Sequence, residues 1–246
     1  MIDPITLEVL REAFVSIVRE MRVTLVRTAY SSILYEGEDF SCVLMDGQAQ
    51  IVAMSRGQDH PLHIVPIAWS MKAVREKFGD DVYPGDVFLH NEPYTGGTHL
   101  NDVAMIYPLF APDGGLFVSP VVRAHWGDVG GMSPGSLSGR ATEIFQEGVR
   151  IPPVKIVDRG RPNQAALDLL FSNMRGPRER LGDYQAMLGT CRKAAERVGE
   201  LTVRYGAPTI REAVAELMDR AEADAPGHSR AAPGRIRVRG APGGRA

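Results

Sequence analysis

Two copies of one small pattern of metal-ligand residue types stand between residues 91 and 136. The first copy is His99 with Asp102, and the second is His125 with Asp128, so that each imidazole precedes a carboxylate by three positions. Imidazole nitrogen and carboxylate oxygen are the donors that hold a divalent ion in a mixed ligand shell. The four residues are therefore candidate ligands of one metal site.

Glycine pairs flank both copies of the pattern. Gly96 and Gly97 stand before the first copy, followed by Thr98, and Gly130 and Gly131 stand after the second. Most glycines in turns only permit a positive φ angle. Beside a cation, however, bare backbone N–H groups can also cradle a phosphate or a carboxylate. We take these five residues as candidates for anion binding.

A hairpin between the two copies would bring them together. The segments 103–110 and 116–123 are apolar and β-prone, and the turn residues Pro112-Asp113-Gly114-Gly115 separate them. A chain that returns on itself in this way places the loop before its first strand beside the loop after its second. We therefore expect the two His/Asp couples to face each other. A lone histidine is more often a structural residue, and the convergence of four side chains is what favours a ligand set.

Two further histidines are candidates for an acid/base or ligand role. His60 and His63 belong to a polar loop, and an amphipathic helix is expected to follow from about residue 64 to residue 78. Histidines just ahead of a helix can hold protons or metals near neutral pH, although they more often pack or cap. His63 is retained as a candidate catalytic residue.

Two glutamates precede an extended segment after the motif. Pro152 and Pro153 exclude a helix there, so that residues 148–156 should lie along the body of the fold. Glu143 and Glu147 stand just before that segment. A surface position is the default expectation for both, but a buried Glu147 would be an acid/base partner for the metal site.

A long helix should open the chain. Asp3 and Pro4 form a helix-opening pair, with Asp3 as N-cap and Pro4 in the first helical position. Apolar residues then recur at helical spacing from Leu7 to Val26. This spacing predicts a helix of about six or seven turns with one broad apolar face.

Strand signals dominate the first part of the chain after its opening helix, and helix signals dominate the part after residue 163. Asp46-Gly47 separates two short apolar runs, residues 40–45 and 50–54, which predicts a hairpin, and residues 87–89 form a strand that enters the motif. Three helical segments follow residue 163, at 164–174, 178–206 and 208–224. We predict an α+β fold: a long N-terminal helix, a mainly antiparallel, hairpin-built sheet that carries the motif loops, and a helical C-terminal half. The strand order is left open.

Composition sets limits on domain organisation and location. The 246 residues, 44% of them hydrophobic, suffice for one substantial core, and a net charge of −2 gives no reason to expect nucleic acid or a membrane as partner. The N-terminus lacks the pattern of a signal peptide. Cys42 and Cys191 stand far apart, so we expect free thiols in a reducing cytoplasm.

The last 22 residues differ from the rest of the chain. Eighteen of them are Ala, Pro, Gly or Arg, and none is acidic. Such a segment is expected to be disordered. We therefore predict one domain over residues 1–224 and a tail over 225–246, which the abrupt change in composition marks as a shortened or frame-shifted end.

The ordered set of motifs resembles the hydantoinase B/oxoprolinase family. The similarity runs from about Asp3 to about Asp224 and is densest between Pro84 and Lys155. The motifs that carry it are Pro84-Gly85-Asp86, Asn91-Glu92-Pro93-Tyr94, Gly96-Gly97-Thr98-His99-Leu100 with Asp102, Arg123-Ala124-His125 with Asp128 to Gly131, Pro134-Gly135-Ser136, and Glu147-Gly148 with Ile151 to Lys155.

The resemblance implies an enzyme subunit that works beside a separate hydantoinase A-type subunit, which binds ATP and phosphorylates the amide or enol oxygen of the substrate. The B-type subunit then completes hydrolysis or carboxylation at a divalent metal, with zinc, manganese and magnesium not distinguished. The family motif implies His99, Asp102 and His125 as ligands and Asp128 as a fourth ligand or an orienting residue. A divalent ion supplies the activation that hydrolysis of a stable lactam requires.

Two departures from the family pattern stand out. Glu92 replaces the aspartate of the usual Asn-Asp-Pro-Tyr, and this longer carboxylate is a candidate for a catalytic role because it could shift a hydrogen bond or a ligand. Family members are also typically much longer. The expected function is a subunit of an ATP-dependent hydrolase of cyclic amides such as hydantoin or 5-oxoproline, in a hetero-oligomer. The alternatives are a subunit of a ketone carboxylase and a non-catalytic fragment.

Overall fold

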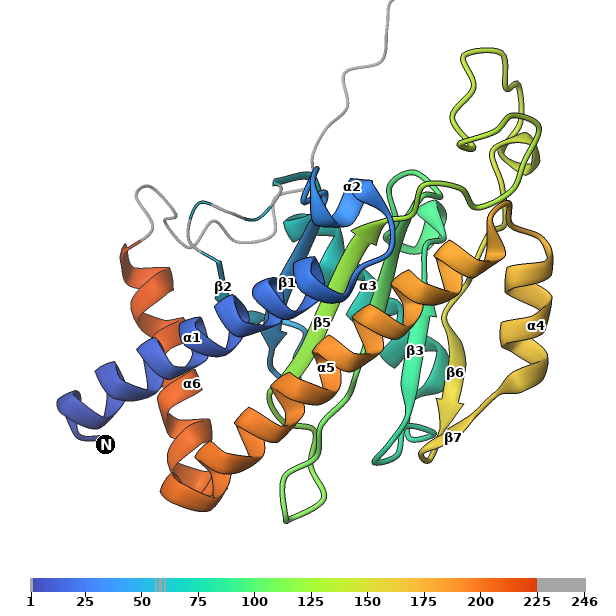
Figure 1. Ribbon diagram of the computed structural model, residues 1–246. Coiled ribbons are helices and arrows are strands. Elements are labelled where there is room, and N and C mark those ends of the chain that lie inside the picture. Colours follow the sequence, from blue (N-terminus) through green and yellow to red (C-terminus); the bar gives the residue numbers. More distant parts are fainter. Residues whose placement is uncertain (1, 56, 58, 60, 225–246) are drawn as a thin grey trace, which may run out of the picture.

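The computed structural model describes residues 2–55, 57, 59 and 61–224 of the chain (Figure 1). The predicted tail at 225–246 and His60 lie outside the described residues. The helices are α1 (Pro4–Thr28), α2 (Ser32–Tyr35), α3 (Pro61–Phe78), α4 (Gln164–Ser172), α5 (Pro177–Tyr205) and α6 (Ala207–Asp224), with 3-10 turns η1 (Pro93–Thr95) and η2 (Ile144–Gln146). The strands are β1 (Phe40–Met45), β2 (Ile51–Met54), β3 (Val87–His90), β4 (Asp102–Ile106), β5 (Ser119–His125), β6 (Val154–Asp158) and β7 (Arg161–Pro162).

The strands form one antiparallel sheet with the order β2-β1-β5-β4-β3-β6-β7. The predicted hairpin is present, since β4 and β5 pair over their length and the isolated bridge from Phe110 to Leu116 extends the connection. β5 also pairs with β1, which lies far away in sequence. The α+β prediction, with its antiparallel sheet, is confirmed, and the structure supplies the strand order.

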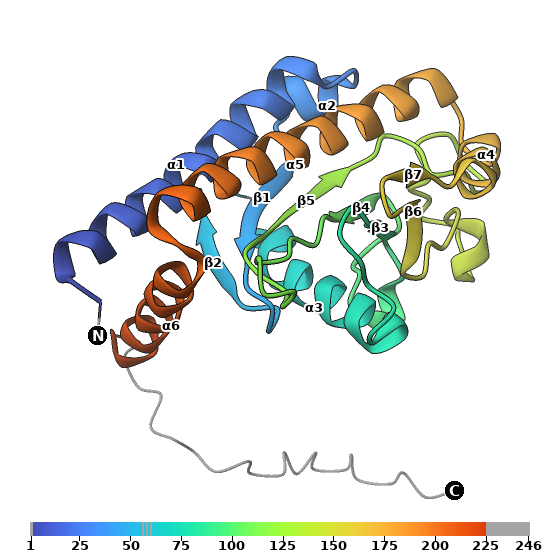
Figure 2. The ribbon, with the colours of Figure 1, turned by 90° about the horizontal axis from the view of Figure 1, so that it is seen from below.

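Helices cover both faces of the sheet. α1 and α5 lie side by side on one face, and α3 lies on the other (Figure 2). β1 is consequently buried on both sides: Cys42 and Leu44 pack with the helices α1 and α5, whereas Val43 and Met45 pack with α3. This double burial explains why β1 is a continuous apolar run in the sequence.

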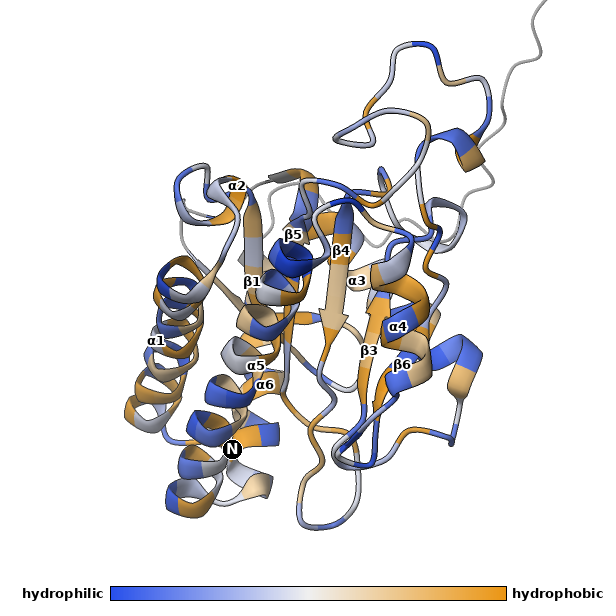
Figure 3. Ribbon diagram, turned by 45° about the vertical axis from the view of Figure 1, so that its right-hand side comes forward, coloured by the Kyte–Doolittle hydropathy of each residue, from blue (hydrophilic) through white to orange (hydrophobic). Residues whose placement is uncertain are grey.

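The hydropathy of the elements follows these layers (Figure 3). The strands are mostly hydrophobic, and α1 and α5 carry hydrophobic and hydrophilic residues on different sides. The N-cap prediction for α1 is confirmed, because Asp3 accepts a hydrogen bond from the backbone N–H of Thr6 at 2.9 Å. Cys42 and Cys191 are both buried, free thiols. Within the described ranges, no helix combines the length and apolar character that crossing a bilayer requires.

The start of α3 corrects one prediction. The helix begins at Pro61 rather than near residue 64, so that His63 lies in its first turn and not in a preceding loop. Proline is favoured at the first helical position because its missing N–H would have had no partner there. The longer helix carries His63 to the end of the sheet where the motif residues gather.

Candidate metal site

The ends of three neighbouring strands, β1, β5 and β4, meet at one end of the sheet. Asp102 begins β4 and His125 ends β5, and the two residues are direct partners in the antiparallel register. Asp39 immediately precedes β1, and its backbone carbonyl accepts a hydrogen bond from the N–H of His125 at 3.0 Å. The pairing of β5 with both neighbours therefore brings an imidazole and two acidic residues together.

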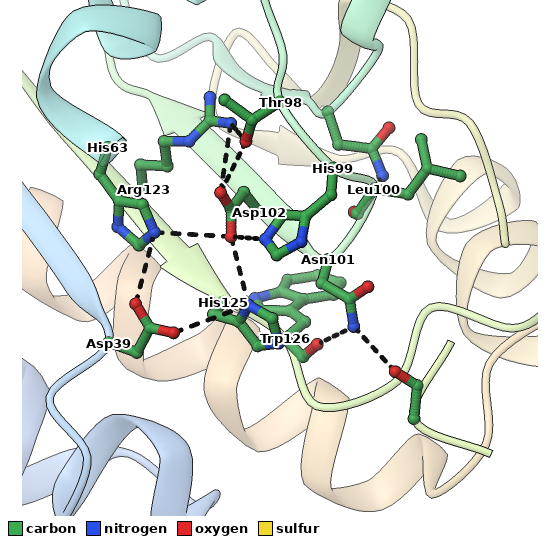
Figure 4. Close-up of polar contacts among 12 residues, drawn as sticks. Asp39, His63, Thr98, His99, Leu100, Asn101, Asp102, Arg123, His125 and Trp126 are labelled. Carbon is green, nitrogen blue, oxygen red and sulfur yellow. Dashed lines mark hydrogen bonds and ion pairs between the residues drawn. The ribbon is translucent and has the colours of Figure 1, made fainter. Parts of the chain in front are cut away.

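The alternation of side chains along the strands decides which face holds the site. Ala104 and Val121 pack in the core beneath α3, and residues two positions apart on a strand share a face. Asp102 on β4, and Arg123 and His125 on β5, therefore project toward α3. His63, in the first turn of that helix, reaches the same group. Figure 4 shows these side chains together.

His99, Asp102 and His125 form a compact donor group. Nε2 of His99 lies 2.5 Å and Nδ1 of His125 lies 3.3 Å from Oδ1 of Asp102, and the two imidazole rings meet edge to face. One ligand atom from each residue lies within 4.8 Å of the other two. A small relaxation brings this spacing within reach of one ion with bonds of about 2.0–2.2 Å, so that the donor set fits a divalent metal.

Asp39 and His63 border this group. Nε2 of His63 lies 3.5 Å from a carboxylate oxygen of Asp39 and 3.5 Å from Oδ1 of Asp102. The second oxygen of Asp39 lies 3.7 Å from Nδ1 of His125. Asp39 belongs to no motif discussed above, and its only signal in the sequence is its position just before the first strand.

A buried guanidinium holds the other side of Asp102. Arg123 is completely buried, and its Nη2 donates to Oγ1 of Thr98 at 2.6 Å and lies 3.6 Å from Oδ2 of Asp102. The Thr98 hydroxyl in turn donates to the same carboxylate oxygen at 2.7 Å. Burial by itself raises the pKa of Asp102, but hydrogen bonds from the three histidines outweigh it and hold the pKa well below its usual range. Asp102 is therefore an anionic carboxylate.

Two buried asparagines fix the loops that carry these side chains. The side-chain amide of Asn91 donates to the carbonyls of Leu100 and Val149, and that of Asn101 donates to the carbonyl of Trp126 at 2.8 Å. The bonds to Val149 and Trp126 join segments that are distant in sequence. The loop before β4 and the loop after β5 are therefore held in register beyond the sheet itself.

Comparison with known proteins agrees with the resemblance in the motifs. The family model described as hydantoinase B/oxoprolinase matches residues 3–233 of the chain. The chain belongs to this family. The caprolactamase subunit beta of Pseudomonas jessenii is 38% identical over 221 residues, which are 90% of this chain and 38% of that protein. The 5-oxoprolinase of Saccharomyces cerevisiae is 30% identical over 230 residues, which are 89% of this chain and 18% of that protein.

Solved structures support the same membership. A crystal structure of ATP-dependent caprolactamase from Pseudomonas jessenii matches with a TM-score of 0.83 at 35% identity, over 91% of this chain and 38% of that chain. A nucleotide-free structure of acetone carboxylase matches with a TM-score of 0.79 at 20% identity, over 86% of this chain and 28% of that chain, and at this identity the match shows a shared fold. The chain thus spans about 38% of the length of its caprolactamase relative.

The structure gathers the three residues that the hydantoinase B/oxoprolinase resemblance implied as ligands, and it places Asp128, implied as a fourth ligand or an orienting residue, outside that group. The Asp128 carboxylate accepts hydrogen bonds from the backbone N–H groups of Gly130 and Gly135, at 2.7 and 2.8 Å, and pairs with Arg175. All of these contacts stabilise the loop after β5. Asp128 thus shapes the family motif that follows His125, and it is not one of the three donors that lie together.

Three of the four N–H groups in the two glycine pairs already donate hydrogen bonds to other residues of the chain. The N–H groups of Gly96 and Gly97 donate to the carbonyls of Pro93 and Glu92, and the N–H of Gly130 donates to Asp128. A Cβ on Gly131 would lie 2.5 Å from the carbonyl oxygen of Gln146. Close backbone approach accounts for glycine at this position, and an anion at these three N–H groups would have to displace existing bonds.

Glu92 and Glu147, the two glutamates predicted as catalytic candidates, lie outside the donor group. Glu92 is buried, and its carboxylate accepts from Nε of Arg150 at 2.7 Å and from the backbone N–H of Tyr94. Glu147 ends the turn η2 in the segment that projects beyond the sheet (Figure 1). The structure therefore brings His63, but neither glutamate, to the three-residue group.

Proposed function

We propose that this chain supplies the metal-holding part of the B-type subunit of an ATP-dependent cyclic amide hydrolase. The observation that carries the proposal is the group of His99, Asp102 and His125, whose donor atoms lie within 4.8 Å of one another in a member of the hydantoinase B/oxoprolinase family. Mixed imidazole and carboxylate shells are typical of hydrolytic metal sites.

The three grouped residues would hold the divalent ion. When bound, the ion would act as a Lewis acid on the oxygen of the activated amide and favour attack by water. Asp128 remains a proposed orienting residue, because it braces the loop after His125. Zinc, manganese and magnesium all stay open, since imidazole and carboxylate serve each of them to some degree.

The surrounding residues have distinct proposed roles. Thr98 and Arg123 hold Oδ2 of Asp102, so that Oδ1 remains directed at the histidines. His63 is buried and is therefore proposed to hold a proton at Nε2 between Asp39 and Asp102 rather than to meet the substrate. The side chain of His99, which is 39% exposed, is the member of the group that faces an incoming substrate.

ATP and a partner subunit complete the proposed reaction. The relatives are described as a subunit beta and as an ATP-dependent enzyme. We infer that a hydantoinase A-type subunit activates the cyclic amide with ATP and that this chain acts on the activated substrate in the hetero-oligomer. Because the chain spans 38% of its caprolactamase relative, the activity is proposed for the assembled protein.

The proposed substrate class is a cyclic amide, without a choice of ring size. The names of the relatives include a five-membered substrate, 5-oxoproline, and a seven-membered one, caprolactam. A cyclic amide is common to both. Carboxylation of a ketone is supported only by the likeness to acetone carboxylase, and at 20% identity that likeness concerns the fold.

An assay of the assembled protein tests this function. The chain is co-purified with its A-type partner, and ADP release is measured with hydantoin, 5-oxoproline, caprolactam, and acetone with bicarbonate. We expect ring opening that requires ATP, the partner and the metal together. Carboxylation of acetone without any lactam hydrolysis would contradict the proposal, as would lactam hydrolysis that persists after removal of the metal.

A further inference from the structure

The two oxygens of Asp102 have separate sets of partners (Figure 4). Oδ1 lies 2.5 Å from Nε2 of His99 and 3.3 Å from Nδ1 of His125, the two imidazoles of the donor group. Oδ2 lies 2.7 Å from the hydroxyl of Thr98 and 3.6 Å from Nη2 of Arg123. One oxygen is therefore directed at the candidate metal site, and the other is directed at the protein around it.

The hydrogen bonds to Thr98 fix the direction of its hydroxyl. Nη2 of Arg123 donates to Oγ1 of Thr98 at 2.6 Å, and a guanidinium has no acceptor to offer in return. The hydroxyl proton is therefore free to point at Oδ2 of Asp102, to which it donates at 2.7 Å. The three residues form a chain of donors that runs in one direction, from the guanidinium through the hydroxyl to the carboxylate.

Burial of the Arg123 guanidinium carries a large desolvation cost. The side chain is 0% exposed, and its Nε and Nη1 have no hydrogen-bond partner among the described residues. Among those residues, the carboxylate within ion-pair distance of Arg123 is that of Asp102. Since a buried charge is stable only beside a partner of opposite charge, the guanidinium and the carboxylate depend on each other.

The register of the hairpin builds this arrangement. Arg123 and His125 stand two positions apart on β5 and therefore share the face beneath α3. On β4, Asp102 pairs with His125 and Ala104 pairs with Arg123. Because the small side chain of Ala104 stands opposite it, Arg123 can reach across to Asp102, its diagonal neighbour.

An ion that took both oxygens of Asp102 would break this arrangement. It would have to displace the proton of Thr98 from Oδ2 and approach the positive charge of Arg123, which repels a cation. An ion bound through Oδ1 meets the imidazoles of His99 and His125 instead. The surroundings of the carboxylate thus favour one oxygen over the other.

We propose that Arg123 and Thr98 are positioning residues that reserve Oδ2 of Asp102 for the protein, so that this ligand offers the ion a single oxygen. The inference rests on the proposed metal site and adds what keeps its coordination shell open. A catalytic metal site keeps a position free for water or substrate, and a second oxygen from Asp102 would occupy that position.

A purely structural role of the two residues leads to a different expectation. If Arg123 and Thr98 only stabilised the fold, their replacement would lower the free energy of unfolding and leave the coordination of the ion unchanged. A measurement of open coordination positions therefore distinguishes the two roles.

Azide binding to the cobalt-loaded chain tests the inference. Cobalt(II) is added to metal-free protein, its visible absorption reports the coordination number, and azide is a small anion that binds at open positions. The dissociation constant of azide is measured for the wild type, Thr98→Val and Arg123→Met. We expect both variants to bind azide at least about 10-fold more weakly and to absorb less strongly, because Oδ2 then takes a position on the cobalt.

Two further variants serve as controls. Thr98→Ser keeps the hydroxyl and should retain the spectrum and the azide affinity of the wild type. Thr190→Val removes a hydroxyl that is buried in α5 and has no hydrogen-bond partner among the described residues, so that it should change neither quantity. Circular dichroism identifies variants that have lost their fold.

The outcomes separate this inference from the proposed function. A wild type that binds cobalt but no azide would overturn the inference and leave the metal site in place. Folded Thr98→Val and Arg123→Met variants with the spectrum and azide affinity of the wild type would overturn it as well. A wild type that binds no cobalt contradicts the metal site itself, and the inference fails with it.

A crystal structure of the cobalt-loaded wild type decides the matter if neither variant folds. Oδ2 of Asp102 on the Thr98 hydroxyl supports the inference. Oδ2 on the cobalt overturns it.

Discussion

Asp102 and His125 are direct partners across β4 and β5, and Nδ1 of the imidazole lies 3.3 Å from Oδ1 of the carboxylate. The register of one hairpin thus brings together two of the three grouped donors. A shift of one residue in this register would turn one of the two side chains to the opposite face of the sheet. The geometry of the site is therefore part of the sheet itself.

Replacement of Asp102 should weaken metal binding more than it changes the fold. Asp102→Asn keeps the shape of the side chain but removes the negative charge that lies among three histidines. We expect the affinity for zinc or manganese, measured by calorimetry, to fall at least about 100-fold. Asp113→Asn, which alters an exposed pair with Arg211, is the control and should bind as the wild type does. Equal affinities for the two variants would contradict the assignment of Asp102 as a ligand.

Gly97 should tolerate no side chain. A Cβ at this position would lie 2.3 Å from the carbonyl oxygen of Asn91, which is backbone and cannot rotate away. We expect Gly97→Ala to lower the free energy of unfolding by about 1–3 kcal/mol in urea titrations. Gly139→Ala meets nothing within 4 Å and serves as the control. Similar midpoints for both variants would show that the loop adjusts more easily than its packing suggests.

Asp183 should be a stabilising link between α5 and the segment that joins α1 to α2. Its buried carboxylate accepts from the backbone N–H groups of Tyr30 and Ser31, at 2.9 and 3.0 Å, and lies 3.4 Å from Nη2 of Arg180. Removing it leaves buried donors without partners, so we expect Asp183→Ala to cost roughly 2–5 kcal/mol of unfolding free energy. Loss of the exposed carboxylate in Glu196→Ala should cost less than about 0.5 kcal/mol. A loss for Asp183→Ala as small as that of the control would refute the link.

His90 should make stability depend on pH. Burial, and then the charge of Arg123, lowers the pKa of the His90 imidazole from 6.5 to about 4, and both ring nitrogens contact hydroxyls, of Ser70 and Thr95. Below pH 6.5 the unfolded chain binds a proton that the folded chain refuses, so the free energy of unfolding should fall as the pH falls from 6.5 to about 4. His90→Gln should lose less stability over this window. An NMR titration of His90 with a pKa near 6.5 would contradict the expected shift.

Local patterns predicted most elements, and long-range pairing accounts for what they missed. Apolar periodicity and the cap at Asp3 predicted α1, and turn residues predicted the β4–β5 hairpin that brings His99 and His125 together. Nothing local indicated that β5 also pairs with β1, which is what places Asp39 beside His125.

The remaining differences at the candidate site also depend on distant partners. His63 reaches Asp102 from the first turn of α3, because that helix begins at Pro61 rather than near residue 64. Glu92 faces Arg150, which follows it by 58 residues, and no spacing within the motif carries that information. The sequence identified both residues as candidates, but their partners are set by tertiary contacts that local patterns do not show.

Metal analysis tests the central proposal most directly. Purified wild-type protein should contain about one divalent ion per chain, and His99→Ala and His125→Ala should each remove it while circular dichroism shows an unchanged fold. Both substitutions take one nitrogen from the group of three donors. Equal metal content in the wild type and in both folded variants would contradict the site.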